Sequence, residues 1–374
     1  TDARAEALEQ GIQGVLDEVA YDRSTKQKSV QKAVEFAPFI QATQSQAELA
    51  ACDLVIEAIV ENERIKKEFF QSLEPQLRPD TILASNTSTI PITQLAEGLQ
   101  HPERFCGIHF FNPVRKMKLV EVIRGKQTSD ETIATAVQHV KKLGKMPVVV
   151  NDGPGFLVNR LLLPYMNEAL ELVCEGVPMK HVERAATNFG MPMGPLALYD
   201  MVGLDTALFA GEVLCTAFPD RFSGSMLLPD MVNAGRLGQK NGTGFYAYTG
   251  KKHKKADDPT IYDLIKPHIK SDTELSRKQL EDRLFLPMLV EATRILEEQL
   301  VRDPRDIDLG MIFGTGFPPF KGGPMFWADQ VGVPKLVEAL RPYESLGKRY
   351  QPTELMTELA ASGGSFYPET IEVE

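Results

Sequence analysis

Two apolar runs, RFCGIHFF (104–111) and KLVEVIRG (118–125), decide the fold of this chain. Each has the short, nearly continuous apolar character of a strand buried on both faces of a sheet. Three further runs of this type are DLVIEAIV (53–60), TILASN (81–86) and MPVVVND (146–152). Helical patterns occupy 61–77 and about 129–144, and a surface helix is expected over 3–20. This alternation of strands and helices predicts an open, parallel α/β sheet.

The pattern changes after NDGPGF (151–156), where long helical patterns replace strand signals. Gly and Pro in this stretch punctuate the chain, so we expect a sheet domain over 1–152. A charged, turn-rich stretch, TGKKHKKADDP (249–259), is typical of a solvated linker, with a basic docking patch as the alternative. The expected helical modules are therefore 153–255 and 256–374.

The helical part contains an internal repeat. RLLLP (160–164) returns as RLFLP (283–287), and DMVG (200–203) is echoed by DQVG (329–332). The Gly- and Pro-rich stretch that starts at Gly190 is likewise echoed from Gly316. Ordered matches at several points predict two copies of one module, against coincidence between amphipathic helices.

Composition narrows the classes of function. At 374 residues the chain is too long for one compact core. Its net charge of -10 argues against nucleic acid as a partner. Four widely spaced cysteines form no CxxC pair, so we expect neither a disulfide framework nor a metal site, and a reducing compartment. No apolar run approaches the roughly 20 residues of a membrane helix.

His109 is the histidine that sits at the end of a predicted buried strand. Ligands of open α/β sheets collect at the carboxyl ends of strands, although a histidine there is more often structural. Glu121 lies on the following strand, where it would pair with His109 across the sheet and fix the imidazole tautomer. The alternative for Glu121 is an exposed strand residue, but its apolar neighbours indicate burial.

Two polar features accompany this pair. ASNTST (84–89), which contains Ser88, ends another strand, and its alternative role is helix capping. Asn159 falls in the first helix after the domain boundary, and clefts between domains are preferred sites for small molecules. Its alternative is an ordinary surface asparagine. RLGQKNGTGFYAY (236–248) would approach a phosphate or form a plain β-turn.

The sequence contains neither a GxGxxG nor a Walker motif. A sheet with a His–Glu pair but no phosphate loop looks like a dinucleotide-binding domain that lacks its first strand, glycine turn and first helix. We expect these elements to precede Thr1. Asp2 then fits the acidic residue that binds the ribose 2′-hydroxyl and favours NAD, or else a helix N-cap.

Seven motifs, in order along the chain, resemble the L-3-hydroxyacyl-CoA dehydrogenase family. They are EAIVENxxxK (57–66), ASNTS (84–88), HFFNPV (109–114), LVEVI (119–123), NDGPGFLVNR (151–160), FGMPMGP (189–195) and GQKNGTGFY (238–246). Two helical modules make the chain similar to the α-subunit of the multifunctional β-oxidation complex. In that subunit an enoyl-CoA hydratase domain precedes the dehydrogenase, and a thiolase β-subunit completes the complex.

The resemblance implies NAD-dependent oxidation of L-3-hydroxyacyl-CoA, with His109 as base and Glu121 as its partner. It implies that Ser88 and Asn159 contact the substrate. The implied NAD contacts are Asp2, Ile59, Val60, Glu61, Lys66, Ser88 and Asn112. Phe313 stands where some α-subunits have a tyrosine. The bacterial cytoplasm is the expected location, with the mitochondrial matrix and the peroxisome left open.

Two alternatives remain. One is a β-hydroxyacid dehydrogenase of the 6-phosphogluconate type, whose catalytic lysine pattern does not occur around His109. The other is an inactive fragment that serves as an assembly or CoA-binding module, because backbone donors of a glycine loop would be needed to hold the pyrophosphate.

Overall fold

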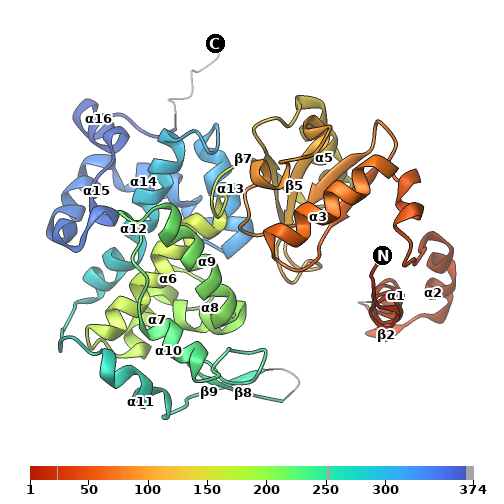
Figure 1. Cartoon of the computed structure of the whole chain (residues 1–374). Helices are drawn as coiled ribbons and strands as arrows, with labels where there is room; N and C mark the ends of the chain where they lie inside the picture. The colour runs from red at the N-terminus through yellow and green to blue at the C-terminus, as the bar shows by residue number, and fades with distance from the viewer. Residues whose placement is uncertain (23, 251–252, 368–374) are drawn as a thin grey trace.

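The computed structural model describes residues 1–22, 24–250 and 253–367, which form three parts (Figure 1). A small N-terminal unit stands apart from a sheet-bearing part, and a larger helical region lies on the other side of the sheet. The N-terminal unit holds α1 (Ala5–Ala20), the hairpin β1 (Tyr21–Asp22) and β2 (Gln27–Lys28), and α2 (Val30–Phe36). The expected surface helix is thus present, whereas no pattern predicted the hairpin or α2.

The sheet has the strand order β3-β4-β5-β6-β7. Its strands are β3 (Leu54–Glu57), β4 (Ile82–Ser85), β5 (Phe105–Phe110), β6 (Leu119–Arg124) and β7 (Met146–Asn151). The helices between them are α3 (Glu63–Leu73), α4 (Ile92–Leu95) and α5 (Asp130–Lys142). β4, β5 and β6 are buried almost throughout, as their continuous apolar runs predict.

The prediction of a fully parallel sheet is wrong at one pair. β5 and β6 are antiparallel, whereas the other neighbouring strands are parallel. A parallel pair needs a crossover of about a dozen or more residues, and the connection 111–118 is shorter than that. The antiparallel register places His109 directly opposite Glu121.

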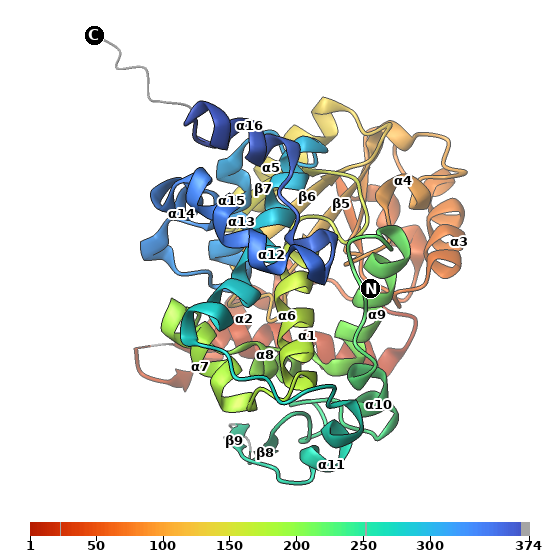
Figure 2. The same ribbon diagram turned by 90° about the vertical axis from the view of Figure 1, so that its left-hand side faces the viewer.

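The helical region surrounds two long helices that pack against each other, α6 (Val158–Cys174) and α12 (Arg277–Glu297). Figures 1 and 2 both show the helices that follow α6 on one side of this pair and those that follow α12 on the other. The first group is α7 (Met179–Phe189), α8 (Pro195–Val202), α9 (Leu204–Ala217), α10 (Leu227–Asn233) and α11 (Ile261–Ile265). The second is α13 (Pro304–Thr315), α14 (Pro324–Val331), α15 (Val333–Leu340) and α16 (Glu354–Ser362).

A small hairpin interrupts this otherwise helical region. It pairs β8 (Ala247–Thr249) with β9 (Lys254–Ala256), so the predicted linker 249–259 is partly ordered, while its residues 251–252 lie outside the described ranges. The expected boundary between 255 and 256 falls within β9. No helix within the described residues combines the length and the apolar character needed to cross a membrane.

Reciprocal ion pairs join α6 and α12. Arg160 Nε donates to Glu291 Oε1 at 2.6 Å, and Arg283 Nε donates to Glu168 Oε1 in the opposite sense. All four side chains are almost completely buried. Each helix thus contributes one buried arginine and one buried glutamate, and each charge finds its partner on the other helix.

Candidate active site

His109, near the carboxyl end of β5, and Glu121 of β6 form a buried pair within the sheet. His109 Nδ1 lies 2.7 Å from Glu121 Oε2, and the two residues are 4% and 0% exposed. A carboxylate accepts hydrogen bonds, so Nδ1 carries the proton in the neutral ring and Nε2 remains an acceptor. The rings of Phe111 and Phe156 flank the imidazole, with centroids 4.5 and 6.0 Å away. The pair therefore presents one oriented basic nitrogen.

The start of α6 satisfies the second oxygen of Glu121. The backbone N–H groups of Leu157 and Val158 donate to Oε1 at 3.2 and 2.9 Å. The first N–H groups of a helix have no partner within it, and they favour negative charge. This contact explains how a carboxylate at 0% exposure is stabilised, and it ties the sheet to the helical region.

A second link between these two parts joins Ser88 and Asn159. Asn159 Nδ2 donates to the backbone carbonyl of Ser88 at 3.0 Å. Ser88 is exposed and Asn159 half-buried, so both remain accessible beside the imidazole strand. Asn86, from the same segment, accepts the N–H of Phe110 at 2.9 Å, which fixes the segment against β5. The alternative role of ASNTST as a helix cap is wrong, since α4 has Pro91 at its N-cap.

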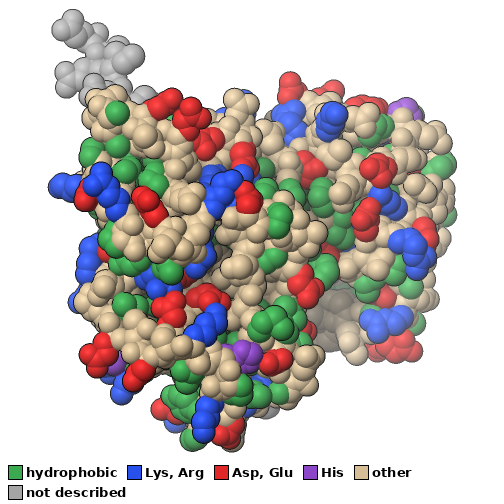
Figure 3. Space-filling model, turned by 60° about the vertical axis from the view of Figure 1, so that its left-hand side comes forward, with side chains coloured by type: hydrophobic (Ala, Val, Ile, Leu, Met, Phe, Trp, Pro, Cys, Tyr) green, Lys and Arg blue, Asp and Glu red, His purple; other side chains and the backbone are tan. Residues whose placement is uncertain are grey.

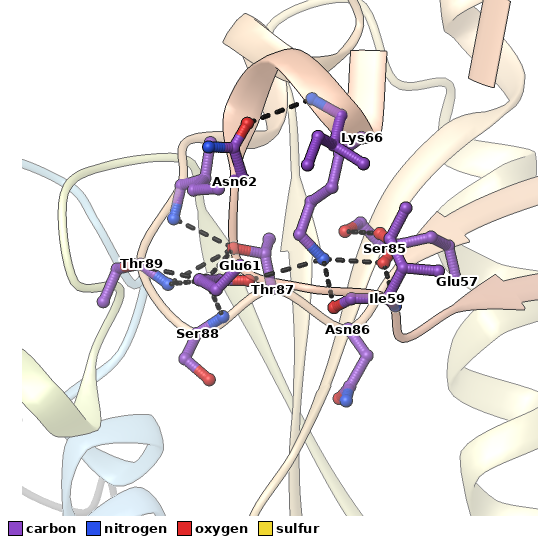
Figure 4. Close-up of polar contacts among 12 residues, drawn as sticks. Glu57, Ile59, Glu61, Asn62, Lys66, Ser85, Asn86, Thr87, Ser88 and Thr89 are labelled. Atoms are coloured by element: carbon purple, nitrogen blue, oxygen red, sulfur yellow. Dashed lines mark hydrogen bonds and ion pairs between the residues drawn. The ribbon is translucent and has the colours of Figure 1, made fainter. Parts of the chain in front are cut away.

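Glu61 organises the turn that carries Ser88 (Figure 4). Its Oε1 accepts from Thr87 Oγ1 at 2.6 Å, from Ser88 N–H at 2.9 Å, and from the N–H and Oγ1 of Thr89 at 3.3 Å each. Burial raises the pKa of Glu61, but these bonds and the charge of Lys66 outweigh it, so the pKa lies below its usual value. The carboxylate is therefore ionised and engaged by the turn.

Lys66 is not at the surface, although it was expected to contact NAD. Its side chain is 1% exposed, and its Nζ lies 2.6 Å from Glu57 Oε1 and 3.3 Å from Glu61 Oε2 (Figure 4). Glu57 also accepts from Ser85 Oγ at 2.6 Å and from Ile59 N–H at 2.6 Å. In this structure the ammonium is thus held between two carboxylates.

Among the other residues expected to contact NAD, Ile59, Val60 and Asn112 follow strands of the sheet, whereas Asp2 lies in the N-terminal unit. Ile59 and Val60 follow β3 and are 40% and 61% exposed, although they are apolar. Asn112 is exposed just beyond β5. Asp2 accepts the N–H of Arg4 at 2.9 Å, and because Arg4 is the N-cap of α1, the alternative role of Asp2 as that cap is wrong. Phe313 is half-buried on α13.

Two structural carboxylates were not predicted from the sequence. Asp152 accepts the N–H groups of Ile92 and Thr93 at 2.8 and 2.7 Å and thereby caps α4 from the domain boundary. Asp200 accepts the N–H groups of Phe245 and Tyr246. A Cβ on Gly244 would lie 1.8 Å from Asp200 Oδ1, so the glycine-rich segment 236–248 is a turn packed on Asp200.

A mostly parallel Rossmann-like sheet, with an imidazole–carboxylate pair closed by a helical region, defines a two-part oxidoreductase that uses a nicotinamide dinucleotide. Residues 1–153 match the NAD binding domain of 3-hydroxyacyl-CoA dehydrogenase, and residues 155–248 and 280–365 match its C-terminal domain. The chain belongs to the 3-hydroxyacyl-CoA dehydrogenase family, whose cofactor is NAD.

Known relatives agree with this assignment. The fatty acid oxidation complex subunit alpha of Pseudomonas syringae pv. syringae is 42% identical over 378 residues, covering 100% of this chain and 52% of the relative. The chain thus spans about half the length of such relatives. The crystal structure of 3-hydroxybutyryl-CoA dehydrogenase from Escherichia coli superimposes with a TM-score of 0.84 at 26% identity, covering 97% of this chain and 92% of that one. (S)-3-hydroxybutyryl-CoA dehydrogenase from Ralstonia eutropha is 40% identical, with a TM-score of 0.63, covering 67% and 89%.

Proposed function

We propose that this chain oxidises L-3-hydroxyacyl-CoA to 3-oxoacyl-CoA with NAD in fatty-acid β-oxidation. The observation that carries the proposal is the His109–Glu121 pair, which leaves Nε2 as an oriented proton acceptor. Ser88 and Asn159 lie at the adjoining domain boundary, where they would position the substrate oxygens. General-base catalysis of this type contributes about 10²–10⁴ in rate.

The residues near β3 fit a dinucleotide. Ile59 and Val60 form an exposed apolar surface at the carboxyl end of a strand, where ligands of such sheets bind. When bound, NAD supplies the hydride acceptor. His109 would accept the proton of the 3-hydroxyl at Nε2, and Glu121 would stabilise the imidazolium that forms. Glu61 would hold the turn that presents Ser88.

His109→Gln tests this assignment. We expect kcat to fall by about 10²-fold or more, because the amide cannot accept the proton, with NADH affinity nearly unchanged. A near-normal kcat would remove His109 from the mechanism. A second experiment titrates NADH fluorescence with this chain and with the chain extended upstream by about 30 residues, the length of a βαβ unit. Binding by neither form would contradict the dehydrogenase function and favour a CoA-binding or assembly module.

The two helical modules are proposed copies of one unit, with the domains 1–152, 153–255 and 256–374. The reciprocal pairs Arg160–Glu291 and Arg283–Glu168 support this, since equivalent residues exchange partners across α6 and α12. The loops support it too: Asp329 accepts the N–H groups of Phe366 and Tyr367 at 2.8 and 3.0 Å, as Asp200 does for Phe245 and Tyr246.

The name of the Pseudomonas relatives supports a place in a fatty acid oxidation complex. By resemblance, a hydratase domain would precede this region and a thiolase β-subunit would associate with it. The bacterial cytoplasm stays the predicted location.

A further inference from the structure

A basic hollow lies where β6 and β7 begin. It has a volume of about 490 Å³ and is formed by the connection between β5 and β6 and the turn before β7. Four of its lining residues are cations, and the remainder are Met117, Leu143 and Gly144. The cations are Arg115, Lys116, Lys118 and Lys145. Among the described residues, no carboxylate lines the hollow.

Two of the four cations hold the loop in place. Lys145 Nζ donates to the backbone carbonyls of Val114 and Met117 at 2.5 and 2.7 Å. Arg115 reaches Glu18 of α1 at 2.5 Å. Across the described part of the chain, Lys116 and Lys118 have no carboxylate within ion-pair distance. The fixed loop therefore presents two ammonium groups that a ligand can use.

The hollow lies across the His109–Glu121 pair from Ile59 and Glu61, two of the residues expected to contact NAD, whereas Asn112 lies in the connection that forms the hollow. Lys118 is three residues from Glu121 along the chain, on the order of 10 Å at the strand rise. Ile59 and Glu61 follow β3, which is three strands from β6, or about 14 Å across the sheet. His109, on β5, lies between the two regions.

We propose that this hollow binds the phosphates of the CoA part of the substrate, which rests on the proposed function. The substrate carries several phosphate charges, and the chain has a net charge of -10, which opposes its approach. Figure 3 shows acidic and basic side chains mixed over the face in view, so attraction must come from local clusters. The hollow, lined by cations and by no carboxylate of the part of the chain that the structure describes, is such a local cluster of positive charge. Hydrogen bonds between these cations and phosphate oxygens would be charge-assisted, which makes them stronger than neutral hydrogen bonds.

The test compares two substrates that differ only in these phosphates. An L-3-hydroxyacyl-CoA and the matching L-3-hydroxyacyl-pantetheine thioester share the reacting atoms, but the second has no phosphate. Lys116→Gln with Lys118→Gln should lower the kcat/KM ratio of the CoA thioester to the pantetheine thioester by about tenfold, with the loss in KM. The effect should shrink as salt concentration rises.

Lys141→Gln with Lys142→Gln is the matched control. These lysines are exposed in the last turn of α5, outside the hollow, and the change in net charge is the same. An equal change of the ratio in both pairs would show a general charge effect and overturn the proposal. A weaker NADH affinity in the Lys116/Lys118 variant, with an unchanged ratio, would assign the hollow to the dinucleotide instead.

A further measurement separates this proposal from the proposed function. If the wild-type chain oxidises neither thioester, the proposed function fails, and calorimetry with free CoA then tests the hollow alone. Binding of CoA by the wild type and the control, but about tenfold weaker binding by Lys116→Gln/Lys118→Gln, would support the site. Equal binding by all three, or no binding by the wild type, would refute it.

Discussion

Replacing Lys66 by Met should destabilise the sheet-bearing part strongly, because the lysine neutralises two carboxylates in the interior. Lys66 and Glu57 are 1% and 0% exposed at their side chains, and their charged atoms lie 2.6 Å apart. Glu61 adds a second carboxylate at 3.3 Å. Removing one partner of a buried pair leaves the other charge uncompensated, which costs about 3–5 kcal/mol.

The size of the loss in unfolding free energy depends on the hydrogen bonds that Glu57 keeps after the substitution. Glu57 keeps the bonds from Ser85 Oγ and Ile59 N–H, so it retains two donors and the loss should stay within that range. For a part of about 150 residues, each kcal/mol lowers Tm by roughly 2–4 °C. We therefore expect Tm of the sheet-bearing part to fall by about 10 °C. Lys66→Met combined with Glu57→Gln should recover most of this loss, because no buried charge then remains at Glu57.

Urea unfolding followed by hydrogen exchange of peptides from β3 and β4 measures this loss where it arises. Lys67→Met is the matched control, since Lys67 is the next residue of α3 and pairs with Glu63 and Glu97 at the surface. Surface pairs contribute about 0–1 kcal/mol. A loss below 1 kcal/mol in Lys66→Met, or an equal loss in both variants, would refute this reasoning.

Three further outcomes are expected. Glu121→Gln should lower kcat by about 10²-fold and move the pH–rate profile, and an unchanged profile would mark Glu121 as merely structural. Burial raises the pKa of Asp308 to about 6, above the unfolded value of 3.8, so its stabilising contribution is present below about pH 4 and is lost as the pH rises to about 6. The stability advantage of wild type over Asp308→Asn should thus shrink by about 2 kcal/mol between pH 4 and pH 6, and a constant difference in urea unfolding would contradict this. Arg160→Met should cost about 3 kcal/mol, at the low end for a buried pair because Arg294 remains 3.4 Å from Glu291. Unfolding midpoints unchanged from wild type would show that the pair contributes nothing.

The sequence predicted the elements better than their directions. Continuous apolar runs located β5 and β6, and His109 and Glu121 stood out as ionisable residues within them. The apolar pattern of a strand does not depend on the direction in which the strand runs. The antiparallel pairing of β5 and β6 follows instead from the short connection 111–118, which is too short for a parallel crossover. The short connection also brings His109 opposite Glu121 in the antiparallel register.

Contacts between distant residues were outside the reach of local patterns. Lys66 appeared as one charged residue in a charged helix, and nothing near it in the sequence shows that Glu57 and Ser85 meet in the interior beside it. Its partner Glu57 closes an apolar strand and resembled an ordinary strand end. The burial of a charge is a property of the assembled sheet, so neither composition nor spacing indicates it.

The proposed catalytic base is assembled from the two parts of the described fold other than the N-terminal unit. β5 and β6 supply the imidazole and the carboxylate, and the N–H groups at the start of α6 occupy the oxygen of Glu121 that His109 does not use. The second module packs against both β6 and the start of α6 through Gly314 of α13. A Cβ at this position would lie 2.7 Å from Leu119 Cδ2 and 3.1 Å from Val158 Cγ2. Because α13 packs this closely against both β6 and α6, a shift of the second module would disturb the carboxylate that orients His109. The second module therefore holds the imidazole–carboxylate pair in place without supplying a group to it.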